Sequence, residues 1–290
     1  MLPQLLVSGL LMGFVFSLIA VGLTLIWGVV EITNFAHGAF LMLAMYATFW
    51  LYDLTWLGLT VSLDPLYALP LCTFLLFLVG IVTYRLIIKR ILTAPIVAQI
   101  FSTFGLNVFL ANLAHFLWTS DYRLIKEPII QGRLEIFGLF ISMPQLVAAG
   151  GAVLATGLVY WFVTRTKTGM ALQATAENKE AAALMGINSD RMFALAWGIG
   201  GACVGVAGAL LANFYFIFPA VGDIFGLTAL VTVALGGFGS IPGAFVAGVV
   251  IGLMQVLGAH FVAPAFKSVV VFVIYLAVVI IRPQGLFGKF

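Results

Sequence analysis

Few residues in this 290-residue chain are of types that do chemistry, and their spacing is not that of a catalytic site. The three histidines, His37, His115 and His260, stand far apart, and no matched pair of acidic residues accompanies them. Cys72 and Cys203 each lie inside an apolar run, where a cysteine is usually a small core residue. The sequence also lacks the G-x-x-x-x-G-K-S/T loop that cradles phosphates. We therefore expect no catalytic residue, no metal site and no cofactor bound by this chain.

The polar residues with the most regular spacing lie inside apolar runs. Gln99, Thr103 and Asn107 recur every four residues, which places them on one face of a helix. Thr228 and Thr232 repeat this spacing later in the chain. Polar residues within a membrane are costly and usually face a bundle interior or a cavity. We interpret these five residues as candidates for a translocation pathway, with hydrogen bonding between helices as the alternative.

Two stretches rich in glycine and polar residues interrupt the apolar runs. The first, residues 31–38, supplies three further pathway candidates, Asn34, His37 and Gly38, whose alternative role is to cap helix ends. Irregular backbone at membrane depth is tolerated only inside protein or along a cavity. The second stretch, residues 235–243, therefore supplies candidates for a gate or helix break: Gly236, Gly237, Gly239, Pro242 and Gly243.

The composition shows what must hold these residues in place. The chain is 63% hydrophobic and 8% charged, with a mean hydropathy of +1.21, whereas a soluble domain has roughly 25% charged residues. Its long apolar runs lack a period of two, so they are helices rather than barrel strands. We expect an all-α integral membrane protein, a polytopic bundle of about eight or nine membrane segments in which the seventh is short or re-entrant. The predicted segments lie near residues 5–28, 38–54, 66–86, 97–118, 144–164, 191–214, 225–236, 241–259 and 266–281.

The basic residues predict an orientation for these segments. Nine Lys and Arg residues fall on one side of the predicted map, which includes the 165–190 loop, and four fall on the other, which includes the 119–143 loop. Cytoplasmic loops carry the excess of Lys and Arg. We therefore expect an outer N-terminus, a cytoplasmic C-terminus and a cytoplasmic 165–190 loop. The outer 119–143 loop is either a small hairpin over the outer mouth or a plain connector.

The 165–190 loop contains the signals of a short helix outside the membrane. Asn178 is a possible N-cap and Gly186 a possible left-handed residue after the helix, with Ala181, Leu184 and Met185 on its apolar side. Its neighbouring charges are of both signs, which favours docking to a protein over binding to anionic lipid.

Several of these stretches together resemble the LivH-type branched-chain amino-acid ABC permease family. The resemblance extends over nearly the whole chain, and its most specific parts are the glycine-rich break and a stretch near residue 285. It is carried by Gly9 to Gly22 with Ala20, Asn34-Phe-Ala-His-Gly38, Glu180-Ala181-Ala182 with Gly186, Gly236 to Gly243, and Arg282-Pro-Gln-Gly-Leu-Phe-Gly288.

The resemblance implies that residues 1–290 form one transmembrane permease domain of an importer for branched-chain or other small neutral amino acids. It implies four kinds of partner and no nucleic acid: membrane lipid, a second related permease, two cytoplasmic ATPase subunits that bind ATP and Mg, and a soluble substrate-binding protein. The chain itself would be a transport subunit of a bacterial-type inner membrane, and not an enzyme. Contact with the ATPase would fall to Glu177, Glu180, Ala181, Ala182 and Gly186.

Two alternatives remain at this point. Permeases of the same type carry urea, short amides or other small neutral solutes, and an uncharged pathway suits all of these. An ion-coupled secondary transporter is the other alternative. It would need ion ligands near the membrane midplane, and the predicted spans hold no central carboxylate.

Overall fold

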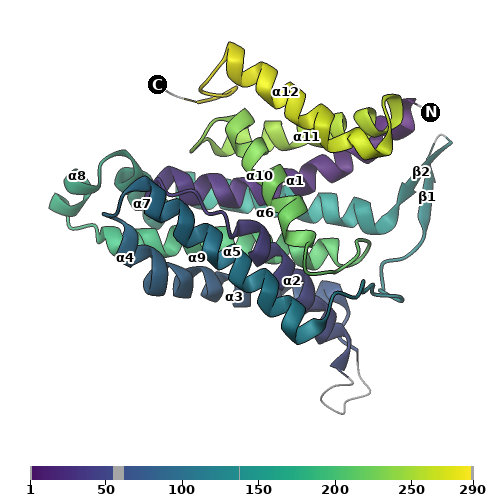
Figure 1. Cartoon of the computed structure of the whole chain (residues 1–290), viewed down its shortest axis with the longest axis horizontal. Coiled ribbons are helices and arrows are strands. Elements are labelled where there is room, and N and C mark those ends of the chain that lie inside the picture. Colours follow the sequence, from purple (N-terminus) through teal and green to yellow (C-terminus); the bar gives the residue numbers. More distant parts are fainter. Residues whose placement is uncertain (1, 55–61, 137, 289–290) are drawn as a thin grey trace.

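The computed structural model describes residues 2–54, 62–136 and 138–288, and in these it is a helical bundle with one small hairpin (Figure 1). The helices are α1 (Leu2–Val30), α2 (His37–Tyr52), α3 (Pro65–Thr83), α4 (Lys89–Ile91), α5 (Ile96–Trp118), α6 (Met143–Arg165), α7 (Lys167–Glu177), α8 (Lys179–Leu184), α9 (Ser189–Leu211), α10 (Val221–Gly236), α11 (Ile241–Phe261) and α12 (Lys267–Ile281). A π-helical turn, Tyr84–Ile88, joins α3 to α4, and a 3-10 turn, Pro264–Phe266, precedes α12. The antiparallel strands are β1 (Arg133–Ile136) and β2 (Leu139–Ser142).

Seven helical segments of the described chain are long and apolar enough to cross a membrane. Two further helices, α2 and α10, have 16 residues each, and at 1.5 Å per residue they extend about 24 Å. That is shorter than a hydrocarbon core of about 30 Å. The nine segments agree with the predicted bundle, and the predicted short seventh segment is α10. The second short helix, α2, was not expected.

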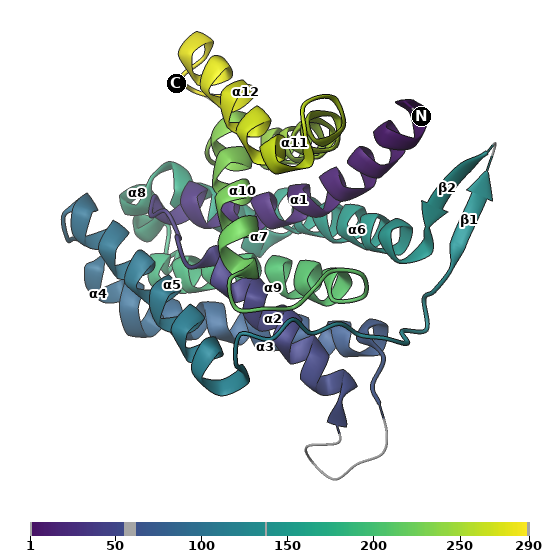
Figure 2. The same ribbon diagram turned by 45° about the vertical axis from the view of Figure 1, so that its right-hand side comes forward.

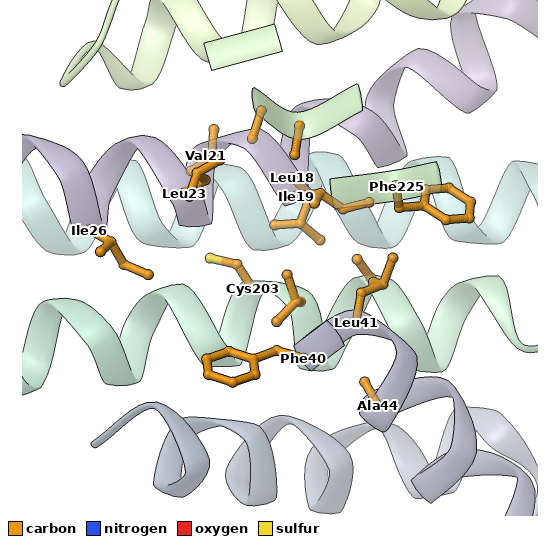
Figure 3. Close-up of a cluster of buried hydrophobic side chains, with 14 of the residues drawn as sticks. Leu18, Ile19, Val21, Leu23, Ile26, Phe40, Leu41, Ala44, Cys203 and Phe225 are labelled. Atoms are coloured by element: carbon orange, nitrogen blue, oxygen red, sulfur yellow. The ribbon is translucent and has the colours of Figure 1, made fainter. Parts of the chain in front are cut away.

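Helix α1 lies at the centre of the bundle, because it is apolar on every face and a helix of that kind buries itself. Small residues let its neighbours approach closely: a Cβ on Gly252 of α11 would collide with the backbone of Gly13. The Ser17 hydroxyl donates to the Phe245 carbonyl of α11 at 2.7 Å. Figure 3 shows the core around α1, with Leu18, Ile19 and Leu23 near Leu41, Cys203 and Phe225.

The short helix α10 crosses the direction of α1 in both views (Figures 1 and 2) and packs against α2. Helices α5 and α12 lie at the edge of the bundle, with most of their apolar side chains exposed. Lipid or another membrane chain can cover such faces without cost, because the bilayer interior is as apolar as the side chains.

The two loops that the basic residues assign to different sides lie at opposite ends of the molecule. The N-terminus and the β1–β2 hairpin share one end, which we call the hairpin end (Figure 1). Helices α4 and α8 and the C-terminal segment share the other, which we call the α8 end. The predicted outer loop thus contains a hairpin, and the predicted 165–190 loop is two helices, α7 and α8. Lys289, one of the nine basic residues, lies outside the described residues.

Candidate translocation pathway and coupling helix

The first break brings two buried polar side chains against α1. The His37 ring, at the start of α2, donates from Nε2 to the Ile19 carbonyl oxygen at 3.0 Å, and Asn34 Oδ1 accepts from the Ala36 amide at 3.1 Å. Both side chains thus have a capping or bridging role. The remaining polar atoms of these two side chains, Asn34 Nδ2 and His37 Nδ1, are buried and have no hydrogen-bond partner in the described part of the chain.

Gly38 is a contact between two helix backbones. A Cβ at this position would collide with the carbonyl oxygen of Gly222 and lie 2.8 Å from the Cα of Gly226, both on α10. The residue is buried and has no side chain to present to a pathway. Its place in the fold is to let α2 and α10 touch.

The predicted polar face of α5 points into the bundle, and each of its residues has a protein partner. Gln99 Nε2 donates to three backbone carbonyls at the turn before α5, those of Ile91, Leu92 and Ala94. The Thr103 hydroxyl donates to the Thr33 carbonyl at 3.1 Å. Asn107 Nδ2 donates to Asp223 Oδ1 of α10 at 3.1 Å. This face therefore joins α5 to the first break and to α10.

The two threonines of α10 differ in their surroundings. Thr232 is fully buried, and its hydroxyl donates to the Thr228 carbonyl at 2.6 Å. Thr228 lines a cavity of about 520 Å³ at the hairpin end, as the other predicted pathway residues do not. Other helices supply the rest of the wall: Leu5, Ser8, Met12, Phe16, Gln145, Phe214, Tyr215, Ile224, Phe225, Gln255, Val256, Ala259, His260, Lys267 and Ser268.

Apart from Thr228, the polar residues of this wall were not among the predicted pathway residues. Gln145 and Gln255 stand alone in or beside apolar runs, without the four-residue repeat used to find Gln99 and its neighbours, and Ser8 repeats only once, with Gln4 near the N-terminus. A solitary glutamine within a membrane span, such as Gln255, is itself the signal that could have identified them.

The second break is a tight corner between α10 and α11. Gly237 has a positive φ of 97°, which a side chain would strain, and Gly236 packs directly against Gly243. Ser240 caps α11 by accepting from the Gly243 amide at 3.1 Å, and Pro242 occupies the first turn, where proline is tolerated. The Thr24 hydroxyl of α1 accepts from the Gly239 amide at 2.9 Å. Every predicted break residue is thus part of one ordered turn.

The segment near residue 285 completes this corner. The Leu286 and Phe287 amides donate to the Leu235 and Gly236 carbonyls, at 2.8 and 3.0 Å. These are the last carbonyls of α10, which a helix leaves without an internal partner. The two most specific stretches of the sequence are therefore bonded to each other.

Helix α8 forms as the sequence predicts. Asn178 Oδ1 accepts from the amides of Glu180 and Ala181, at 3.0 and 2.9 Å. At the other end Gly186 has a φ of +80°, and the Gly186 and Ile187 amides donate back to Ala183 and Ala182, which is the Schellman arrangement.

The surface of α8 differs from the predicted one. Ala182 is the buried residue, whereas Ala181, Glu177 and Glu180 are exposed. Leu184 is 89% and Met185 82% exposed, at the tip of the helix. Two large apolar side chains in this position form a knob with no partner among the described residues.

The whole chain matches one family. The sequence model of the family described as branched-chain amino acid transport system, permease component, matches residues 5–279. The chain belongs to this family. Family members are transport permeases, so the chain is a multi-pass membrane transport subunit rather than an enzyme.

Curated family members are similar over nearly their full length. The chain is 30% identical to the high-affinity branched-chain amino acid transport system permease protein LivH of Salmonella typhimurium, over 97% of this chain and 94% of that protein. It is 30% identical to BraD of Pseudomonas aeruginosa, over 99% and 95% of the two chains. A probable LivH of Methanocaldococcus jannaschii is 28% identical, over 93% and 88%. No solved structure matches the chain at a significant level.

Proposed function

We propose that this chain is the permease of an ABC importer that moves branched-chain or other small neutral amino acids into the cytoplasm. The full-length similarity to permeases named for high-affinity branched-chain amino acid transport carries this proposal. ATP and Mg would be bound by two ATPase subunits. A second related permease and a soluble substrate-binding protein complete the complex. Glu177, Glu180, Ala181, Ala182 and Gly186 belong to the segment that contacts the ATPase.

The exposed tip of α8 supports this arrangement. A soluble partner can bury Leu184 and Met185 in an apolar pocket, as helix-in-groove complexes do. The helix lies at the α8 end, where the basic residues gather, so this end is assigned to the cytoplasm. The hairpin and the N-terminus then face outward, in a bacterial-type inner membrane.

Uptake by the reconstituted complex tests the function. The chain is co-expressed with a candidate ATPase, second permease and binding protein from the same organism, and the complex is placed in proteoliposomes with ATP inside. We expect uptake of labelled L-leucine that stops without ATP. Uptake of urea or a short amide in place of leucine would identify the alternative substrate class. Leucine uptake driven by an ion gradient without ATP would contradict the proposal.

A further inference from the structure

The cavity at the hairpin end lies where five helices meet. The beginnings of α1, α6, α10 and α12 and the last part of α11 form its wall. In the proposed orientation all of these helix ends face outward. A volume of about 520 Å³ is within the range of roughly 300–1,000 Å³ typical of small-molecule sites.

The polar side chains of this wall have hydrogen-bonding capacity to spare. Ser8, Gln145 and Gln255 are half-buried, and none of them makes a hydrogen bond to another described residue. An amide in an apolar helix bundle is costly unless it meets a partner. Here the side chains instead meet the cavity. A water or a solute within it is the partner available to them.

The charge and shape of the wall select among solutes. Lys267 supplies a cation, and no acidic residue lines the cavity within the described part of the chain. A glutamine side-chain carbonyl can accept hydrogen bonds from an ammonium group, so Gln145 and Gln255 complement the lysine. Met12, Phe16 and Phe225 also line the cavity and supply apolar surface to it. This is the complement of a zwitterion that carries an aliphatic side chain.

We propose that this cavity binds the solute during transport, with Lys267 at its carboxylate and Gln145 and Gln255 at its ammonium group. The class of solute rests on the proposed function, whereas the location and the residues rest on the cavity itself. None of Gln99, Thr103 and Asn107 lines this cavity, and the last two instead bond α5 to Thr33 and to Asp223.

Protection from a thiol reagent tests the site without relying on the binding protein. Ser8→Cys and Ala259→Cys are introduced singly into the reconstituted permease complex, without binding protein. The native Cys72 and Cys203 are buried and stay in place. An impermeant reagent from outside should modify both new cysteines. L-leucine should slow this modification several-fold, and L-leucinamide, which lacks the carboxylate, should not.

Matched controls separate the site from general effects. Ser120→Cys, exposed on the 119–143 loop, should be modified with no protection by leucine. Lys267→Gln should abolish the protection of Ala259→Cys, Lys267→Arg should retain it, and Lys126→Gln on the predicted outer loop should leave it unchanged. Removing a hydrogen bond to a charged group should lower the apparent affinity for leucine about tenfold or more.

Three results would overturn this inference. They are no modification of either cysteine, modification that leucine does not slow, and equal protection by leucine and leucinamide. If leucine uptake by the wild-type complex is normal in these cases, the site fails and the proposed function stands. If the wild-type complex transports no leucine but another solute protects both cysteines, the function fails and the cavity stands as its site.

Discussion

At the scale of single residues, Gly38 allows a specific prediction because the backbone of α10 lies directly against it. We expect Gly38→Ala to destabilise the protein by about 1–3 kcal/mol, the usual cost of overpacking. The added methyl group meets the Gly222 carbonyl rather than a side chain that can rotate away. Thermal unfolding in detergent measures the effect. The control is Gly105→Ala, whose Cβ meets nothing within 4 Å on the exposed helix α5, and which should be neutral or stabilising. Equal melting temperatures for the two variants would contradict the assigned contact.

Gly186 makes the second residue-scale prediction. Its Cβ would meet nothing within 4 Å, so the cost of a side chain comes from the left-handed backbone alone. Gly186→Val should cost roughly 1–2 kcal/mol locally and displace the tip of α8, which lowers ATP-dependent uptake. Gly186→Asn should keep most of the activity, because asparagine tolerates this conformation. Uptake and membrane content are measured on the same vesicles. Loss of activity in both variants would mean that bulk, and not backbone strain, is the cause.

Residue roles that depend on neighbouring sequence could be predicted, and those that depend on distant sequence could not. Asn178 and Gly186 cap α8 through bonds to residues within four positions, so sequence alone identifies them. The bond from Asn107 joins it to Asp223 on a different helix. Its periodicity showed that it faces inward but not what it meets.

At the scale of elements, α8 is predicted to dock by its tip. The double variant Leu184→Ser, Met185→Ser should weaken binding of the ATPase subunit about a hundredfold, since burying each side chain contributes about 1.5 kcal/mol or more. Co-purification of the two subunits measures this. Membrane insertion should not change, because α8 lies outside the spans. The control is Ile129→Ser, an apolar residue of the 119–143 loop that is also exposed, at 65%. ATPase retention by the double variant would remove α8 as the docking element.

The existence of the helices was easier to predict than their ends and partners. Apolar runs identify spans because a membrane helix must be apolar along its length, whichever neighbour it has. The short helix α7 carries no such run, and its packing depends on a close contact between Gly169 and the end of α6. Only the folded arrangement reveals it. For the same reason the sequence predicted only α8 within the 165–190 loop and not α7.

At the scale of the whole molecule, the two ends should differ in access from outside the cell. Ser120→Cys at the hairpin end and Ala183→Cys on α8 are both exposed positions. An impermeant thiol reagent on intact cells should label position 120 and not position 183. After the cells are opened, both should react. The buried native cysteines give little background. Labelling of position 183 alone in intact cells would show that the protein has the opposite orientation.

The bond between residues 286–287 and the end of α10 also has a consequence for the order of assembly. Synthesis proceeds from the N-terminus, so α10 enters the membrane before the amides that cap its last carbonyls have been made. An unsatisfied carbonyl in lipid costs roughly several kcal/mol. Until residues 286–287 arrive, the last carbonyls of α10 must therefore be hydrogen-bonded by water or by the insertion machinery, or the end of α10 must stay outside the lipid. The turn between α10 and α11 therefore reaches its final hydrogen bonding only after α12 has been inserted into the membrane. The end of α10 is therefore fixed in place by a segment that is synthesised after α11 and α12.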